Sequence, residues 1–194
     1  MNTPTGILRQ EHEAILGMLD ATETAARRLS AGESMEPRLL EGLLEFFQLF
    51  ADRCHHGKEE ELLFPRLMAR GMPAQSGPIQ VMLAEHDEGR TLIRRMKEAA
   101  AAYAQGSPEA GRDWAQAAHG YVSLLRDHIS KENNILFVMA DRLLTGEDQK
   151  ELSAAFEEVE TEKMGPGEHE RLHGLMEQLK SAIRLPTAAG PSRG

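Results

Sequence analysis

The chain is short of cysteine and of aromatic residues: among 194 residues it has one cysteine, one tryptophan and two tyrosines. A single cysteine excludes an intrachain disulfide and fits a reducing compartment. No apolar run approaches the roughly 20 residues needed to span a bilayer, and the start, MNTPTGILRQEHE, lacks the basic and apolar parts of a signal peptide. These absences predict a cytoplasmic protein.

Positive charge is also scarce, with 22 lysines and arginines against 31 acidic residues and a net charge of -9. Because a net negative charge disfavours association with other polyanions, we expect no nucleic-acid partner and no membrane partner. Valine, isoleucine and tyrosine are few, whereas alanine, leucine, glutamate and methionine are common, a composition that favours helices over strands. We identify no internal repeat.

Glycine and proline gather between four long amphipathic segments, at residues 4–31, 36–70, 79–105 and 108–144. Long helices with short connections predict an all-α, up-down-up-down four-helix bundle over residues 1–146. Two shorter helices are expected in residues 147–185, as a C-terminal extension packed on the bundle. The tail, residues 186–194, is expected to be disordered.

Each long segment carries one histidine within its apolar face. In the second segment, His56 and Glu60 share a face with leucines, whereas His55 and Glu59 fall on a face that we expect to be exposed to solvent. The same periodicity applied to all four segments predicts six inward-facing polar side chains: His12, His56, Glu60, His86, His128 and Glu132.

A buried histidine is more often a hydrogen-bonded core residue than a ligand, so the spacing alone is weak evidence. The common height of these side chains is stronger, because in each hairpin the two histidines lie nearly equally far from the turn. Two carboxylates buried without compensation cost several kcal/mol each, and divalent cations would compensate them. Six ligands suit two ions about 3.5–4 Å apart with bridging carboxylates. Imidazole and carboxylate without thiolate favour iron or manganese, with zinc as a third candidate.

A second pattern lies near the C-terminus, where HERLH, from His169 to His173, matches the zinc-protease pattern H-E-x-x-H. Such a protease needs a third ligand further along the chain. Here Glu177 follows on the same helix, too near to complete the site. We therefore expect a solvated helix face at this position.

The inward side chains also carry a family resemblance. The pattern His12, "HGKEE" from His56 to Glu60, His86, and "HISKE" from His128 to Glu132 resembles that of the hemerythrin-like, or HHE cation-binding, family. The resemblance implies a four-helix bundle around a non-haem di-iron centre bridged by the two glutamates.

One position departs from the oxygen-carrying hemerythrins, which have a further histidine one turn after the ligand on the third helix. This chain has Arg90 there, which cannot ligate, so the resemblance implies one iron with a more open coordination sphere. We expect a protein that binds or senses O2, peroxide or nitric oxide, with oxidase or peroxidase-like activity as an open question. The alternative is an iron-responsive regulatory or metal-holding protein without catalysis. The sequence identifies no catalytic residue and no protein partner.

Overall fold

The long helices start at residues suited to a helix N-terminus. Thr3 caps α1 (Pro4–Ser30), where its hydroxyl accepts a hydrogen bond of 3.1 Å from the Gly6 amide. Proline is also the first residue of α2 (Pro37–Phe46), α4 (Pro78–Ala104) and α5 (Pro108–Lys131). The first helical position lacks an intrahelical partner for its N–H, so proline is tolerated there.

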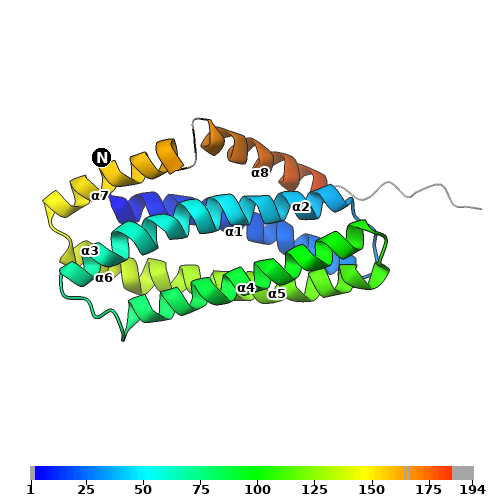
Figure 1. Cartoon of the computed structure of the whole chain (residues 1–194), viewed down its shortest axis with the longest axis horizontal. Helices are drawn as coiled ribbons and strands as arrows, with labels where there is room; N and C mark the ends of the chain where they lie inside the picture. Colours follow the sequence, from blue (N-terminus) through cyan, green and yellow to red (C-terminus); the bar gives the residue numbers. More distant parts are fainter. Residues whose placement is uncertain (1–2, 164, 166, 185–194) are drawn as a thin grey trace, which may run out of the picture.

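The computed structural model describes residues 3–163, 165 and 167–184, and this part of the chain is helical, without strands. Figure 1 shows the long helices side by side, with α5 packed between α1 and α4. The expected all-α bundle is confirmed. None of the described helices is both long and apolar enough to cross a bilayer. The expected disordered tail, residues 186–194, lies outside the described residues.

The second long helix is not a regular α-helix. After α2 it continues as the π-helical segments η1 (Phe47–His56) and η2 (Glu59–Leu63), and it ends as α3 (Phe64–Ala69). A π-helical turn closes over one more residue than an α-helical turn. The rotation per residue therefore falls below the roughly 100° of an α-helix, so the α-helical period misplaces some of the side chains beyond Phe47.

The fourth long helix changes in the same way. α5 passes into the π-helical segment η3 (Glu132–Leu136) and then into α6 (Phe137–Leu143). The π segments η2 and η3 each begin with a glutamate that is fully buried. Short π segments occur frequently at functional sites.

The core consists of two apolar clusters on either side of a polar layer. The cluster near the open ends of the hairpins includes Leu8, Phe64 and Phe137, whereas the larger one includes Leu19, Phe47 and Leu125. Buried histidines and glutamates of all four long helices lie between them. The bundle thus encloses a ring of titratable groups that is closed above and below by hydrocarbon.

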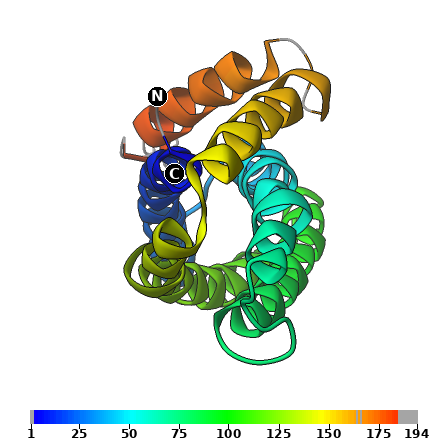
Figure 2. The same ribbon diagram turned by 90° about the vertical axis from the view of Figure 1, so that its left-hand side faces the viewer.

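The C-terminal extension comprises α7 (Gly146–Glu158), η4 (Val159–Lys163) and α8 (Glu168–Arg184). Figures 1 and 2 show α7 and α8 on one side of the bundle, next to α1 and the second long helix. A Cβ atom on Gly42 would meet Leu179 at 2.9 Å. The glycine therefore allows α8 to approach α2 closely.

The start of α7 is fastened by a network of side chains. Thr145 and Asp148 form a capping box, which satisfies two backbone N–H groups at the helix end. The Asp148 carboxylate also accepts hydrogen bonds from Arg66 at 2.6 Å and from Arg70 at 2.8 Å. α7 is thereby held against the end of the second long helix.

Candidate metal centre

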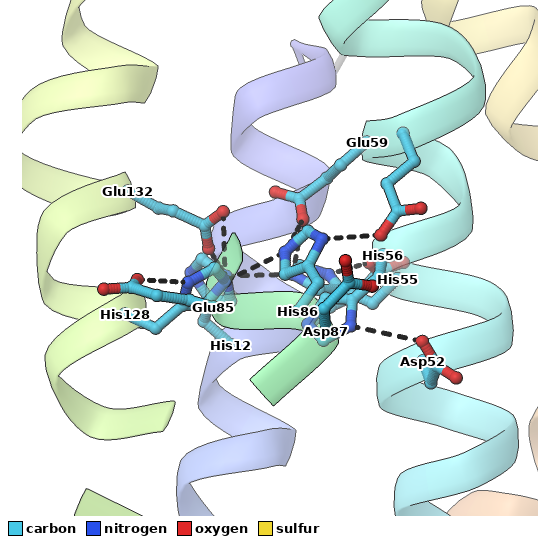
Figure 3. Close-up of polar contacts among 12 residues, drawn as sticks. His12, Asp52, His55, His56, Glu59, Glu85, His86, Asp87, His128 and Glu132 are labelled. Carbon is cyan, nitrogen blue, oxygen red and sulfur yellow. Dashed lines mark hydrogen bonds and ion pairs between the residues drawn. The ribbon is translucent and has the colours of Figure 1, made fainter. Parts of the chain in front are cut away.

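Seven side chains of the four long helices meet in the polar layer (Figure 3). They form two groups whose ligand atoms lie within 4.8 Å of one another, and Glu59 belongs to both. One group, here called the three-histidine group, is His56, Glu59, His86 and His128. The other, called the two-histidine group, is His12, His55, Glu59 and Glu132.

The structure brings together five of the six predicted side chains and replaces the sixth. His55 and Glu59 were expected to face solvent, but their side chains are 1% and 0% exposed. Glu60, expected to face the core, is a quarter exposed and lies outside both groups. The cause is the π-helical backbone of η1 and η2, which turns His55, His56 and Glu59 inward together.

Four of the five histidines direct Nδ1 to a hydrogen-bonding partner outside the two groups, whereas Nδ1 of His56 lacks such a partner among the described residues and lies 3.5 Å from Asp52. Nδ1 lies 2.7 Å from Glu11 in His55 and 2.7 Å from Glu60 in His86. In His12 and His128, Nδ1 lies 3.0 Å from Asn133 and from Glu85, respectively. Hydrogen bonds of this kind fix the tautomer and ring orientation of metal-bound histidines. Glu60 is thus placed to orient His86.

The opposite nitrogens face one another across the layer. Nε2 of His12 lies 3.0 Å from Nε2 of His55, and Nε2 of His86 lies 3.1 Å from that of His128. An ionised carboxylate only accepts hydrogen bonds, so rings that donate from Nδ1 present lone pairs at Nε2. Two nitrogens each about 2.1 Å from one ion at a right angle are ~3.0 Å apart. The spacing fits a cation between each pair.

The two buried glutamates connect the groups. Glu132 lies 3.1 Å from Nε2 of His12 and 3.3 Å from Nε2 of His128. Glu59 Oε2 lies 3.5 Å from Nε2 of His86 and 3.8 Å from that of His55. None of the four carboxylate oxygens has a partner with hydrogen-bond geometry among the described residues. Buried unpaired carboxylates are costly, and two cations bridged by Glu59 and Glu132 would satisfy them.

Burial in the layer shifts the pKa values of several of its groups. Burial, together with the charge of Glu132, raises the pKa of Glu59 well above its usual value. Burial also lowers the pKa of His55 to about 4 and that of His56 well below its usual range. The imidazoles of these two residues are therefore neutral at pH 7, which is the form that binds metal.

An internal repeat relates the two halves of the layer, and it was not recognised from the sequence. The second and fourth helices share the pattern R-x-H-x-x-K-E-x-x-x-L-F, at residues 53–64 and 126–137, and the first and third share Glu-His, at residues 11–12 and 85–86. Equivalent contacts follow: Lys58 and Lys131 bind Glu11 and Glu85, respectively. The repeat pairs Glu59 with Glu132 and Glu60 with Asn133. This repeat is the sequence signal that would have identified Glu59, instead of Glu60, as the counterpart of Glu132.

The repeat is broken at two positions near the two groups of ligands. His56 corresponds to Ile129 in the other half, so one group has three imidazoles and the other has two. The partner of His86 is the carboxylate of Glu60, whereas the partner of His12 is the amide of Asn133. Two histidines with carboxylates leave open positions on a metal such as iron. The two-histidine group is therefore the more open one.

Arg90 is held at the edge of the layer, away from the buried glutamates. Its guanidinium binds Asp52 at 2.8 Å and Glu60 at 2.7 Å, and it approaches Asp87 at 3.2 Å. A cleft of about 260 Å³ beside Arg90 reaches the rings of His56 and His86. Small molecules thus have a path to the three-histidine group.

The HERLH pattern of α8 and the single cysteine do not join the layer. His169 and His173 lie on α8 against Phe50, with ring centroids 5.9 and 6.0 Å away, and neither belongs to the two groups. Cys54 is buried, and burial raises the pKa of its thiol to about 11. It therefore remains a protonated thiol at pH 7.

The helical bundle, the buried histidines and the two buried glutamates together define a metal-binding protein of the hemerythrin class. The chain belongs to the family described as the hemerythrin HHE cation binding domain, whose sequence model matches residues 3–140. It is 35% identical over 142 residues to the iron-sulfur cluster repair protein YtfE of Escherichia coli (strain K12 / DH10B). The protein of that name from Shigella boydii serotype 18 (strain CDC 3083-94 / BS512) shows the same identity. Each alignment covers 70% of this chain and 61% of the relative, so the chain spans about three fifths of the length of these relatives.

Proposed function

We propose that the chain holds a non-haem di-iron centre and uses it to bind or react with a small oxidant: O2, a peroxide or nitric oxide. The observation that carries the proposal is the convergence of inward-facing imidazoles on two buried glutamates that lack hydrogen bonds. The proposed ligands are His56, His86 and His128 for one ion, His12 and His55 for the other, and Glu59 and Glu132 as bridges.

Iron is favoured over manganese and zinc by the family and by the donors, which are nitrogen and oxygen without thiolate. Bound iron would supply a redox-active centre with exchangeable positions for small ligands. The chain's own residues orient the imidazoles through Glu11, Glu60 and Glu85. Hydrocarbon on both sides of the layer excludes bulk water from the centre.

Size and charge at the cleft fit such ligands. Its volume of about 260 Å³ admits molecules of a few atoms, and Arg90, Arg94 and Lys97 line it beside Tyr121. Arg90 is already paired with Asp52 and Glu60, which leaves its charge largely compensated. The path is therefore suited to small neutral molecules, and it does not exclude small anions.

The test is the iron content and optical spectrum of protein loaded anaerobically with Fe(II). We expect two iron ions per chain, and absorption changes on addition of O2, hydrogen peroxide or nitric oxide. His55→Ala is expected to lose at least one ion. His119→Ala, which alters an exposed histidine on α5, serves as the control and should keep both. One ion per chain in the wild-type protein would contradict the proposal.

A second candidate is supported by the name of the relatives: the chain supplies or holds iron for the repair of iron-sulfur clusters. In that case iron should pass from the loaded protein to a [4Fe–4S] hydro-lyase inactivated by nitric oxide and restore its activity. A pure iron holder should show this transfer without spectral response to O2 or nitric oxide. A responsive protein that restores nothing would favour the first candidate.

A further inference from the structure

Lys58 is an unusual side chain for the interior of a bundle, because it is 0% exposed. Its ammonium group binds the carboxylates of Glu11 and Glu160, the latter at 2.5 Å, and it lies 5.8 Å from the ring centroid of Phe156. A lysine is almost never fully buried unless it is paired. Two carboxylates, one from α1 and one from η4, compensate this one.

The same contacts lead directly to the metal centre. The second oxygen of the Glu11 carboxylate binds Nδ1 of His55 at 2.7 Å. Glu160, Lys58, Glu11 and His55 therefore form an unbroken chain of polar contacts from the C-terminal extension to the two-histidine group. Glu160 and Phe156 lie beyond residues 3–140, which the family model matches. This connection therefore involves residues outside the region that the family model covers.

The other half of the layer shows what the connection adds. There Lys131 binds Glu85, and Glu85 binds Nδ1 of His128 at 3.0 Å. In contrast to Lys58, the side chain of Lys131 is 37% exposed, and in the described part of the chain the ion pair found for it is with Glu85. The extension therefore covers one half of a repeated arrangement and leaves the other open to solvent.

We propose that Lys58 and Glu160 are positioning residues through which the C-terminal extension fixes the orientation of His55, and thereby the retention of the ion in the two-histidine group. The inference rests on the di-iron centre proposed above. Glu160 holds the ammonium of Lys58, which holds the Glu11 carboxylate in the rotamer that accepts from His55. The ion bound by His56, His86 and His128 has no such dependence.

The experiment measures release of Fe(II) from the full chain to a ferrous chelator under anaerobic conditions. The wild-type protein should release its two ions in two phases. Glu160→Gln removes the charge that holds Lys58 and should accelerate one phase by about tenfold, the lower range for loss of a residue that supports a ligand. The other phase should not change. Lys131→Gln should give the converse result and accelerate the other phase.

Glu157→Gln is the matched control, because Glu157 is exposed and lines the same cavity beside α7 as Glu160. It should leave both phases unchanged. In a His55→Gln background, which should retain only the ion of the three-histidine group, Glu160→Gln should leave the release of that ion unchanged, since the effect acts through the His55 imidazole. Circular dichroism checks that each variant is folded, and Glu160→Asp, with a shortened side chain, replaces Glu160→Gln if the latter does not fold.

If Glu160→Gln accelerates both phases equally, Glu160 has a general structural role and the inference is overturned. If Glu160→Gln releases iron at the wild-type rates, the inference is overturned as well. Faster release of the remaining ion when Glu160→Gln is added to His55→Gln would overturn it as well. If the wild-type protein binds fewer than two ions, the proposed function fails before the inference is tested. The two failures are therefore distinguishable.

Discussion

Removal of metal should lower the stability of the fold by an amount that follows from the two bridging glutamates. Glu59 and Glu132 are 0% exposed, and none of their carboxylate oxygens has a hydrogen bond among the described residues. An unpaired buried polar group costs about 1–3 kcal/mol by mutational measurements, so the pair costs ~2–6 kcal/mol. For a chain of this size, 1 kcal/mol shifts Tm by about 2–4 °C. Metal-loaded and metal-free protein should therefore differ by roughly 4–24 °C.

The variant Glu59→Gln tests the cause of this difference. In the metal-free protein, burial and the charge of Glu132 raise the pKa of Glu59, so the folded state binds more protons than the unfolded state. Stability is then greatest below the unfolded pKa and falls as pH rises toward the raised folded pKa. Glu59→Gln removes this loss, and it should raise the Tm of metal-free protein at pH 8 while it lowers iron content.

Glu60→Gln is the control at the neighbouring position, because it should change the Tm of metal-free protein in the opposite direction. Burial alone would raise the pKa of Glu60, but hydrogen bonds from His86 and Arg90 hold that pKa below its usual value. Its contribution is present above the unfolded pKa and is lost as pH falls, so Glu60→Gln should lower the Tm of metal-free protein at pH 8. Thermal unfolding followed by circular dichroism, after chelation and between pH 5 and pH 8, measures both. If Glu59→Gln melts at or below the wild type without metal, the reasoning is refuted.

Three further changes test separate parts of the structure. Ile129→His places an imidazole at the position equivalent to His56, and it should slow the reaction of the ferrous protein with nitric oxide several-fold at unchanged iron content, as measured by stopped-flow absorption. Thr145→Ala removes the cap of α7 and should lower stability by about 1 kcal/mol without loss of iron, measured by chemical denaturation. Cys54→Ala should leave iron content and spectrum unchanged, because the thiol lies outside both groups of ligands; a changed spectrum would place it at the centre.

The apolar faces of the long helices predicted the bundle well, because they depend on an average over many residues. Single positions in the second helix were less predictable. With about 100° of rotation per residue, the leucines of this helix share a face with His56 and Glu60, and the same period places His55 and Glu59 toward solvent. The π-helical backbone from Phe47 onward changes the rotation, and the composition of the segment does not reveal it.

Comparison of the chain with itself would have corrected the assignment without a structure. When Phe64 is aligned with Phe137, Glu59 falls on Glu132 and His55 on His128. The contact between Lys58 and Glu160 is different in kind. It joins segments about 100 residues apart, and no periodicity of either helix specifies which surface of the bundle the extension covers.

The differences between the halves act in the same direction, which argues that two ions bound there would have unequal tasks. An ion held by His86 and His128 would gain a third imidazole from His56, and Glu60 would make His86 a more basic ligand. An ion held by His12 and His55 would have one imidazole fewer and a neutral partner behind His12. Weaker coordination favours exchange of small ligands but also loss of the metal. The buried contact of Lys58 with Glu160 supports the two-histidine half. The C-terminal extension would therefore compensate for the weaker metal retention that an open coordination sphere causes there.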